Sequence, residues 1–480
     1  MKRIVWARLC VFVLALSFVR AAPGEAATRK PTNFVIILVD DLGWTDLSCQ
    51  GSKYFETPHV DKLAAEGMRF TDGYAACAVC SPTRAAVQTG RYPARVGVTD
   101  WIRARFQGGI IPPSGKNPSG YTGRGKLLCP LNALFMESDE ITLAEALEPA
   151  GYVSCHIGKW HLGQQAHFPE KQGYDFNHGG CDLGQPPNYF DPYRSGRPHY
   201  LIPNLKPRKE GEYLTDREAD EAVAFIEANK GRPFLLNMCH YAVHTPIQAK
   251  KDVTAKYAAK PKTNQKNPVY AAMVESVDDA TGKIVAALDE CGVADRTLVI
   301  FTSDNGPWLS KGKAGGCALP LRAGKFTVYE GGMRMPCIMR WPGRIPAGTT
   351  CSEVAATIDV LPTLARLAGA EAPTDRTIDG RDIAPLMFAA PGAKSPHEAY
   401  FLRTGAVRAG KWKLHLKGHR KKGKPAAGVE LYDLEADISE KHNVAAEHPE
   451  VVERLTRLLM DHRQDLATNH RPVGKLEEVQ

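Results

Sequence analysis

Beyond its first thirty positions the sequence lacks any run of about twenty apolar residues, the length that a membrane-spanning helix requires. It also lacks a strong charge of one sign: 61 basic residues stand against 53 acidic ones, a net charge of +8 over 480 residues. This balance does not by itself indicate a nucleic-acid partner. With 43% hydrophobic and 24% charged residues, the composition is that of a folded globular protein and does not indicate disorder. We therefore expect a globular chain with no nucleic-acid partner and no stable membrane span.

Residues 1–27 are predicted to be a signal peptide. Basic residues at positions 2, 3 and 8 precede the 11-residue apolar run LCVFVLALSFV, and small residues follow from Ala21 to Ala27. We expect the mature chain to be secreted or periplasmic; an uncleaved anchor is the alternative. An oxidising compartment favours disulfides. Of 12 cysteines, Cys10 lies in the leader, so 11 remain and at least one stands outside any pairing.

Four short apolar segments have the pattern of buried parallel strands that end in polar residues: 33–44, 152–158, 234–243 and 297–306. Segments with helical patterns alternate with them, at 57–68, 142–152, 216–230 and 268–292. This alternation predicts an α/β fold with a large, mostly parallel sheet flanked by helices. Ligands bind beyond the carboxyl ends of such strands, which is where the polar residues are expected to gather.

The remaining segments predict two long loops and a smaller C-terminal unit. Residues 101–140 and 181–212 are rich in Gly, Pro and Ser and are expected to run as loops over the sheet edge and to select the substrate. After about residue 385, short runs and the segment 448–466 predict a small antiparallel sheet with a terminal helix. We therefore expect a catalytic domain at 28–385 and a C-terminal subdomain at 386–480. The basic run 417–428 is interpreted as a solvated loop, with polyanion binding as the alternative.

Cys80 is predicted to lie at the N-terminus of a helix. Ser81 suits the N-cap, Pro82 the first helical position, and Gly90 the C-terminal end. Free N–H groups and the helix dipole favour an anion at this position, and Arg84 adds a planar cation one turn later. The segment is therefore expected to receive a negatively charged group.

Three other roles for this cysteine fit the sequence less well. A phosphatase thiol has an arginine six positions after it, whereas Arg84 stands four positions after Cys80 and seven after Cys77. A redox C-x-x-C pair leaves the acids at the strand ends unexplained. A zinc site needs a second pair of ligands, and the chain contains no other C-x-x-C string.

The string CSPTRAAVQTGR at 80–91 resembles the C-x-P-x-R signature of the type I, formylglycine-dependent sulfatases. Further blocks resemble that family in the same order: VDDLGW (39–44), GKWHLG (158–163), HTP (244–246), SDNG (303–306), residues 321–343 and ELYDLEAD (430–437). The segments TDWI (99–102) and 373–380 are similar to the arylsulfatase A and N-acetylgalactosamine-6-sulfatase branch. The resemblance implies an alkaline-phosphatase-like fold and a sulfatase that acts on sulfated carbohydrate.

The resemblance also implies a metal site with one Ca²⁺ ion. Its ligands are expected to be Asp40, Asp41, Asp304 and Asn305, with the modified Cys80 close by. The residue chemistry agrees independently, because carboxylate and amide oxygens form a hard ligand set that suits calcium or magnesium rather than zinc.

In this family a formylglycine-generating maturation enzyme oxidises the cysteine to formylglycine (3-oxoalanine). By resemblance, one hydroxyl of the aldehyde hydrate at position 80 attacks the sulfur of a sulfate monoester, with help from the metal and Asp304. Loss of the second hydroxyl's proton, to His161, then expels inorganic sulfate. His244 or Lys325 donates the proton of the leaving group. The implied contacts are Lys159, Lys325 and His244 to the sulfate, and Arg84 and His161 to the hydrate.

Three positions depart from the family pattern. Ala323 and Phe326 stand where many relatives have glycine, and Gln88 begins the string QTGR where LTGR is more usual. We expect these changes to affect local packing and no catalytic group. Two other functions stay open at this point: a phosphomonoester or phosphonate hydrolase on the same fold, and a secreted polyanion-binding protein whose Cys80 is never matured.

Overall fold

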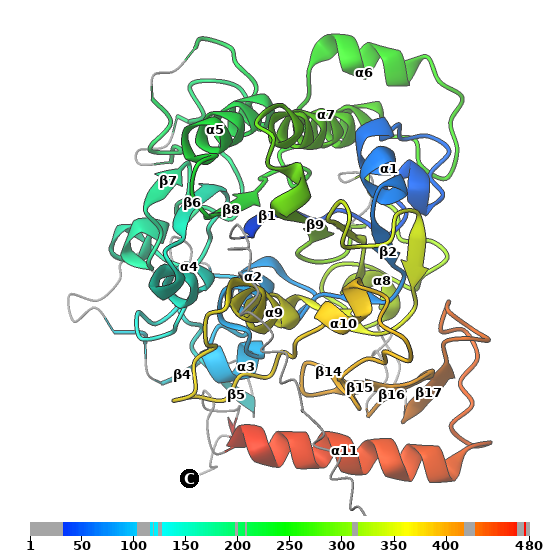
Figure 1. The fold of residues 1–480 in the computed structure, drawn as a ribbon. Coiled ribbons are helices and arrows are strands. Elements are labelled where there is room, and N and C mark those ends of the chain that lie inside the picture. Colours follow the sequence, from blue (N-terminus) through cyan, green and yellow to red (C-terminus); the bar gives the residue numbers. More distant parts are fainter. Residues whose placement is uncertain are drawn as a thin grey trace, which may run out of the picture.

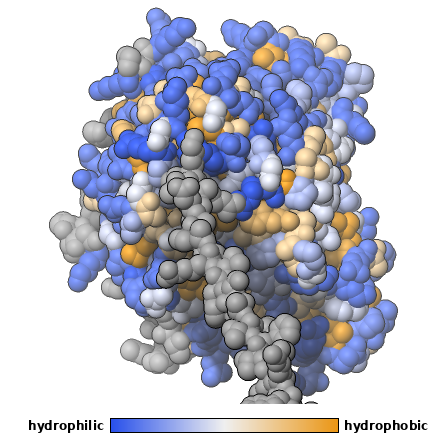
Figure 2. Space-filling model, in the orientation of Figure 1, coloured by the Kyte–Doolittle hydropathy of each residue, from blue (hydrophilic) through white to orange (hydrophobic). Residues whose placement is uncertain are grey.

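A computed structural model of the chain describes residues 32–102, 116–118, 120–122, 127–196, 200–206, 209–309, 315–416, 428–467 and 475–476. The predicted signal peptide and the basic segment up to residue 427 lie outside these ranges. Among the helices within them, none is long and apolar enough to cross a membrane. Hydrophilic residues cover most of the face shown in Figure 2, with apolar residues in scattered patches.

An eight-stranded mixed sheet forms the centre of the molecule (Figure 1). Its strands, in spatial order, are β12 (Thr349–Cys351), β2 (Met68–Phe70), β11 (Cys337–Arg340), β9 (Thr297–Ser303), β1 (Asn33–Val39), β8 (Phe234–Cys239), β6 (Val153–Gly158) and β7 (Phe176–His178). Only β11 runs antiparallel to its neighbours, β9 and β2. The four strands expected from the sequence are β1, β6, β8 and β9, and they lie side by side in the middle of this sheet. The prediction of a large, mostly parallel sheet is confirmed.

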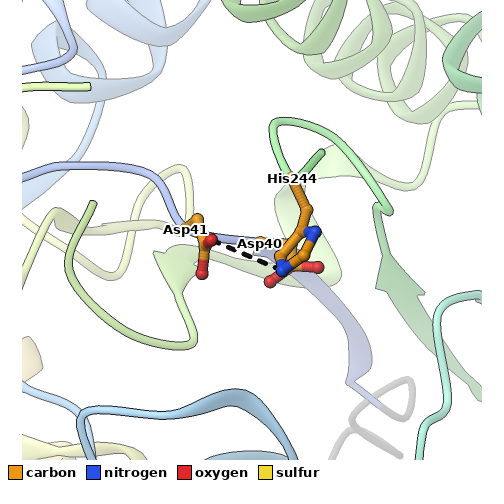
Figure 3. Close-up of side chains that lie close together, drawn as sticks. All are labelled: Asp40, Asp41 and His244. Carbon is orange, nitrogen blue, oxygen red and sulfur yellow. Dashed lines mark ion pairs between the residues drawn. The ribbon is translucent and has the colours of Figure 1, made fainter. Parts of the chain in front are cut away.

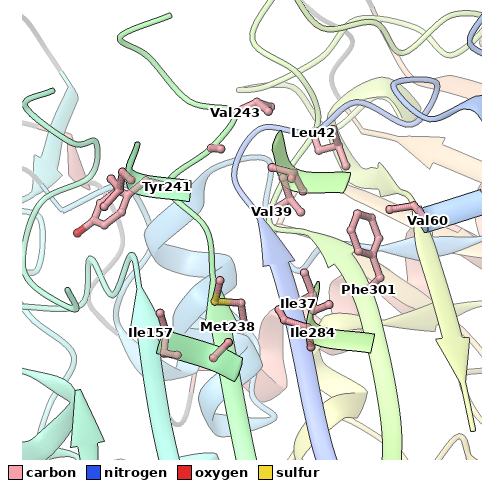
Figure 4. Close-up of a cluster of buried hydrophobic side chains, with 14 of the residues drawn as sticks. Ile37, Val39, Leu42, Val60, Ile157, Met238, Tyr241, Val243, Ile284 and Phe301 are labelled. Carbon is pink, nitrogen blue, oxygen red and sulfur yellow. The ribbon is translucent and has the colours of Figure 1, made fainter. Parts of the chain in front are cut away.

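Helices cover both faces of the sheet because its central strands are apolar on both sides. On one face lie α1 (Pro58–Ala65), α5 (Leu214–Asn229), α6 (Lys251–Ala258) and α7 (Pro268–Glu290). On the other lie α2 (Cys80–Thr89), α4 (Leu143–Leu147) and α9 (Val360–Ala368). Residues of β1 alternate between the two cores: Ile37 packs on the α7 side, and Ile36 on the α2 side. Figure 4 shows Ile37 beside Met238 of the neighbouring strand β8, with Ile157 of β6 beyond it.

The C-terminal part contains the expected antiparallel sheet and terminal helix. The sheet runs in the order β14 (Tyr400–Leu402), β15 (Ala406–Ala409), β16 (Trp412–His415) and β17 (Glu430–Asp433), and α11 (Pro449–Ala467) packs along it. One apolar cluster joins Tyr74 and Met333 of the larger part to Tyr400 of β14. The two parts therefore share a core, and the boundary at 385/386 stays a prediction.

Smaller elements surround these two sheets. One three-stranded sheet contains β10 (Arg334–Met335), β3 (Gly73–Tyr74) and β13 (Ala355–Ala356), in that order. A second contains β18 (Lys475–Leu476), β5 (Leu127–Pro130) and β4 (Tyr121–Thr122). The short helices are α3 (Pro93–Val96), α8 (Glu330–Met333) and α10 (Ala384–Met387). Strands β4 and β5 lie within 101–140, so that segment is not loop throughout.

The start of helix α2 differs from the prediction by one residue. Val79, with extended backbone, is the N-cap, and Cys80 is already the first helical residue. Ser81 does not cap the helix; its hydroxyl instead accepts a hydrogen bond from the backbone N–H of Ile102, 3.0 Å away. The C-terminal end agrees with the prediction, since Gly90 has a left-handed φ of 68°.

Candidate active site

The acidic residues that follow β1 and β9 meet at the carboxyl edge of the sheet. Val39 and Ser303 are aligned partners in these parallel strands, so the residues after them emerge together. The backbone N–H of Asp41 points to Asp304 Oδ1 at 3.3 Å, and Asn305 Nδ2 donates to Asp41 Oδ1 at 2.6 Å. Asp41 has a left-handed φ of 62°, a conformation that costs a non-glycine residue free energy and is typical of functional sites.

Three cations on other elements contact these carboxylates. Lys159 Nζ lies 2.5 Å from Asp40 Oδ2, and Lys325 Nζ lies 2.6 Å from Asp41 Oδ1. The guanidinium of Arg84, on α2, donates through Nε to Asp304 Oδ2 at 2.9 Å and through Nη1 to the Lys159 carbonyl at 2.7 Å. All these side chains are buried, so each charge depends on its partner.

The carboxylates perturb each other strongly. Burial and the nearby charge of Asp304 raise the pKa of Asp40 well above its usual value. Burial opposes ionisation of Asp41 too, but Lys325 and His244 outweigh it and lower the pKa of Asp41 to about 2. Two buried oxygens, Asp40 Oδ1 and Asn305 Oδ1, have no hydrogen-bond partner. Unpartnered buried oxygens beside crowded carboxylates fit a hard divalent cation.

His244 lies in the segment after β8 and points toward Asp40 and Asp41 (Figure 3). Its Nε2 is 3.6 Å from Asp41 Oδ2, and Asp40, Asp41 and His244 each place a ligand atom within 4.8 Å of the others. Its Nδ1 lies 3.1 Å from the hydroxyl of Thr245. Burial, and then the charge of Lys325, lower the pKa of His244 to about 3. His244 is therefore close both to the acids and to the cavity described below.

Cys80 and His161 form a second part of the site. Cys80 Sγ lies 3.4 Å from His161 Nδ1, and His161 Nε2 lies 2.9 Å from the carbonyl oxygen of Ile102. That carbonyl can only accept, so Nε2 carries the proton and Nδ1 is the acceptor in the neutral ring. Burial, followed by the charge of Lys159, lowers the pKa of His161 well below its usual value. Cys77 is also buried and forms no disulfide with Cys80.

A cavity of about 300 Å³ opens above these groups. Of the residues predicted from the sequence, Cys80, His161, His244 and Lys325 line it, whereas Arg84 and Lys159 lie behind it on the carboxylates. The lining also includes residues with no role in the sequence prediction: Trp101, Ile102, Asp182, Leu183, Gly184, Gln185, Tyr200, Trp308 and Phe326. Five of these fall in 181–212, and Trp101 and Ile102 fall in 101–140, the two segments that were expected to cover the site. Trp308 had no signal in the sequence.

The expectation that the departures from the family pattern touch no catalytic group is wrong for Phe326. Its ring centroid lies 5.7 Å from Lys325 Nζ, and the ring lines the cavity. Ala323 and Phe326 have left-handed φ values of 60° and 73°, a conformation that glycine adopts more readily than other residues. Gln88 is buried and accepts a hydrogen bond from the Tyr174 hydroxyl at 2.8 Å, so its role is in packing, as expected.

This fold and this site define a hydrolase of anionic esters, with a helix N-terminus, cations and acids around one cavity. The sulfatase family profile matches residues 32–370, and the profile of the N-sulphoglucosamine sulphohydrolase C-terminal region matches residues 324–465. The chain therefore belongs to the sulfatase family and is a sulfuric ester hydrolase.

Individual relatives agree with this assignment. The chain is 33% identical to arylsulfatase A of Homo sapiens, over 95% of this chain and 92% of that protein, and 36% identical to N-acetylgalactosamine-6-sulfatase of Canis lupus familiaris, over 84% and 75%. The crystal structure of Ps i-CgsB in complex with k-i-k-neocarrahexaose superposes with a TM-score of 0.74 at 31% identity, covering 92% of this chain and 94% of that one. The expected branch and the alkaline-phosphatase-like fold are confirmed.

Proposed function

We propose that this chain is an exported sulfatase that removes sulfate from carbohydrate, using a formylglycine made from Cys80 and one bound Ca²⁺ ion. The carbohydrate part rests on the relatives: one is named for N-acetylgalactosamine 6-sulfate, and another was solved with k-i-k-neocarrahexaose. Export rests on the leader at 1–27, and the division into a catalytic domain and a C-terminal subdomain remains part of the proposal.

The observation that carries this proposal is the position of Cys80. It is the first residue of α2, it lines the cavity, and its Sγ is 3.4 Å from an acceptor nitrogen of His161. A formylglycine hydrate places hydroxyl oxygens where Cβ now bears sulfur. One hydroxyl supplies the nucleophile for the sulfate ester, and the second allows sulfate to be expelled.

The metal ligands are proposed to be Asp40, Asp41, Asp304 and Asn305, with the group at position 80 beside them. Their oxygens match the preference of Ca²⁺, and the two unpartnered oxygens of Asp40 and Asn305 support the assignment. Bound there, the cation supplies positive charge that favours the deprotonated nucleophile and stabilises the sulfate oxygens.

The remaining side chains bind the sulfate group, transfer protons or hold the carboxylates in place. Lys325 and His244 line the cavity, where they contact sulfate oxygens. Lys325, which carries its proton, is the better donor to the departing alcohol, because the lowered pKa of His244 leaves that ring neutral. His161 Nδ1 accepts the proton of the group at position 80, because its Nε2–H is committed to Ile102. Arg84 and Lys159 hold Asp304 and Asp40 in place. Contact of Lys159 with sulfate, and of Arg84 with the hydrate, remains part of the proposal.

The first test is the mass of the tryptic peptide Phe70–Arg84 from protein made beside a formylglycine-generating enzyme. We expect the loss of two hydrogens and one sulfur and the gain of one oxygen that convert the CH2–SH group of Cys80 to the aldehyde. The same protein should release sulfate from 4-nitrophenyl sulfate faster than phosphate from 4-nitrophenyl phosphate. Cys80→Ala is the control and should retain the fold with no turnover.

Three results contradict the proposal. An unmodified thiol at position 80, in material where a control sulfatase was matured, removes the formylglycine mechanism. A strong preference for the phosphate ester favours the phosphomonoesterase alternative. Affinity for sulfated glycans without turnover, after complete maturation, favours the polyanion-binding alternative.

A further inference from the structure

Lys325 lies on a segment without regular secondary structure. This segment, residues 322–329, directly precedes α8 and is here called the lysine loop. Its backbone is left-handed at two residues with a Cβ, Ala323 and Phe326, one on each side of Lys325. Such a conformation is disfavoured and persists only where the surrounding structure holds it. The position of Lys325 therefore depends on the contacts that hold the lysine loop.

The lysine loop is closed on itself. The backbone N–H of Lys325 donates to the carbonyl of Pro307 at 3.0 Å, and the N–H of Gly331, in α8, donates to the carbonyl of Arg322 at 2.9 Å. A Cβ added to Gly331 would lie 2.3 Å from the carbonyl oxygen of Ala323, so the two ends of the loop are in close contact. We expect a shift of either end to reach Lys325, three residues after Arg322.

The side chain of Arg322 binds the C-terminal part of the chain. Its Nη1 donates to the hydroxyl of Tyr432, on β17, at 2.9 Å and to the carbonyl of Glu440 at 2.8 Å. Its Cζ lies 3.7 Å from the ring centroid of Tyr329, the last residue of the lysine loop. A planar guanidinium can stack on a ring and donate at its edge at the same time. Arg322 therefore connects both ends of the loop to the C-terminal part.

Glu440 contacts the same two ends from the C-terminal part. Its side chain is fully buried. Its Oε2 accepts a hydrogen bond from the backbone N–H of Glu330 at 2.7 Å, and its Oε1 lies 3.0 Å from Nζ of Lys413, on β16. Its backbone carbonyl accepts from Arg322, at the start of the loop. A single buried residue of the C-terminal part therefore holds the beginning and the end of the lysine loop.

We propose that the C-terminal part of this chain positions Lys325 for catalysis, and that Arg322 is the positioning residue through which it does so. This inference rests on the proposed role of Lys325 toward the sulfate ester. Lys325 lines the cavity and its Nζ lies 2.6 Å from Asp41 Oδ1, whereas the lining contains neither Arg322 nor Glu440. Loss of the Arg322 contacts displaces Lys325 from the ester and leaves Cys80, on α2, in place.

The test is a double-mutant cycle of Arg322→Ala and Lys325→Ala in matured enzyme. The aldehyde at position 80 is confirmed by mass, and kcat/KM is measured with 4-nitrophenyl sulfate. Arg322→Ala should lower kcat/KM by about tenfold to a hundredfold, since a small misplacement of a reacting group has an effect of that size. In the Lys325→Ala background the same change should have an effect of less than about twofold, because a residue that acts through Lys325 has no further effect without it.

A second variant perturbs the same link less. Tyr432→Phe removes one acceptor of Arg322 and retains the ring, so the fold should be unchanged by melting temperature. We expect a smaller loss of kcat/KM in the same direction, again absent in the Lys325→Ala background. This variant tests the inference even where Arg322→Ala does not fold.

Arg344→Ala is the matched control. Arg344 is half-buried like Arg322 and lies over an aromatic ring, with Cζ 4.9 Å from the centroid of Trp341, but it does not line the cavity and follows β11 rather than preceding α8. Its kcat/KM should equal that of the wild type. Equal values in the wild type, Arg322→Ala and Tyr432→Phe overturn the inference.

Equal factors of loss for Arg322→Ala on both backgrounds also overturn it, because a general structural defect lowers both alike. Two further results concern the proposed function instead. Full activity of Lys325→Ala removes the proposed role of Lys325, and the inference with it. Failure of the wild type to release sulfate from 4-nitrophenyl sulfate, with the aldehyde present, overturns the proposed sulfatase mechanism itself.

Discussion

Nδ1 of His161 lies 3.4 Å from Sγ of Cys80, and the opposite nitrogen of the same ring is held by the Ile102 carbonyl. This arrangement turns the acceptor nitrogen toward position 80, which we propose as the nucleophile. His161 also has a left-handed φ of 58°, so the backbone is held in a disfavoured conformation at this residue. The ring is therefore placed to accept a proton from position 80.

Replacing His161 by alanine should slow sulfate release about a hundredfold or more, since general acid–base groups contribute that much. The first release of alcohol should persist as a burst of about one equivalent, because His161 acts in the step that expels sulfate. The measurement is rapid-quench detection of 4-nitrophenol and sulfate, with the aldehyde at position 80 confirmed by mass. His448→Ala, on a 38% exposed side chain, is the control. Equal slowing of alcohol and sulfate, without a burst, contradicts this role.

Adding Ca²⁺ should raise the melting temperature of the protein, because a ligand that binds only the folded state stabilises it by about 2.7 kcal/mol at a hundred times its Kd. Asp40→Asn should abolish most of this rise, since Asp40 supplies an unpartnered buried oxygen. Asp278→Asn is the control: with His59 and Asp279, Asp278 forms another group of possible ligands, but its carboxylate accepts the N–H groups of His59 and Val60. A rise of equal size in Asp40→Asn would place the ion elsewhere.

Glu330→Ala should destabilise the protein by about 3 to 5 kcal/mol, the cost of leaving buried charges unpaired. Glu330 is fully buried and contacts Lys413 at 2.7 Å, Arg334 at 2.5 Å and the Tyr74 hydroxyl at 2.6 Å. Lys413 is on β16, so this cluster joins the C-terminal sheet to the larger part. The measurement is the free energy of unfolding in urea.

The exposed pair of Glu453 and Arg457 on α11 is the control for that experiment. Glu453→Ala should change stability by less than about 1 kcal/mol, because surface ion pairs contribute little. Losses of similar size in the two variants would show that the buried cluster does not hold the parts together.

Protonation of His462 should destabilise the fold as the pH falls below about 6.5. The ring is buried and stacks on Phe401 at 3.8 Å between centroids, and burial, with the nearby charge of Arg95, lowers the pKa of His462 to about 4. Between these two pKa values the unfolded chain binds more protons than the folded one. The contribution of neutral His462 to the free energy of unfolding is therefore fully present above pH 6.5 and is lost as the pH falls toward 4. The expected loss between pH 7.5 and pH 5 is about 2 kcal/mol.

His462→Phe tests this effect, because phenylalanine retains the ring stacking and does not titrate. Unfolding free energies are measured for both proteins at pH 7.5 and pH 5, and the wild type should lose about 2 kcal/mol more than the variant. An equal loss in both proteins would assign the acid sensitivity to other groups.

Much of the site could be predicted from short segments. Asp40 and Asp304 each follow a continuous apolar run, and such runs are read as parallel strands whose ends share one edge. The helix at Cys80 was predicted to within one residue, because Pro82 and Gly90 are strong local signals. The prediction that Ser81 caps the helix was wrong, because its hydroxyl accepts a hydrogen bond from the backbone N–H of Ile102, 21 residues away.

Residues that depend on distant contacts could not be predicted in this way. No local pattern shows that His244 lies 3.6 Å from Asp41, or that Trp308 lines the same cavity. The antiparallel placement of β11 between β9 and β2 could not be predicted from the sequence either. Phe326 was noticed as a departure from the family, but its proximity to Lys325 became clear only from the structure.

The sequence by itself determined the class of fold, the order of its main strands and helices along the chain, and the groups that we propose to carry the chemistry. Apolar periodicity, helix start and stop signals and family motifs are local properties, so they can be recognised in the sequence alone. The tertiary structure decided which of those groups face the cavity and which support them from behind. It also decided what lines the cavity, because Trp101, Leu183 and Trp308 come from separate loops whose positions follow from packing over the whole chain.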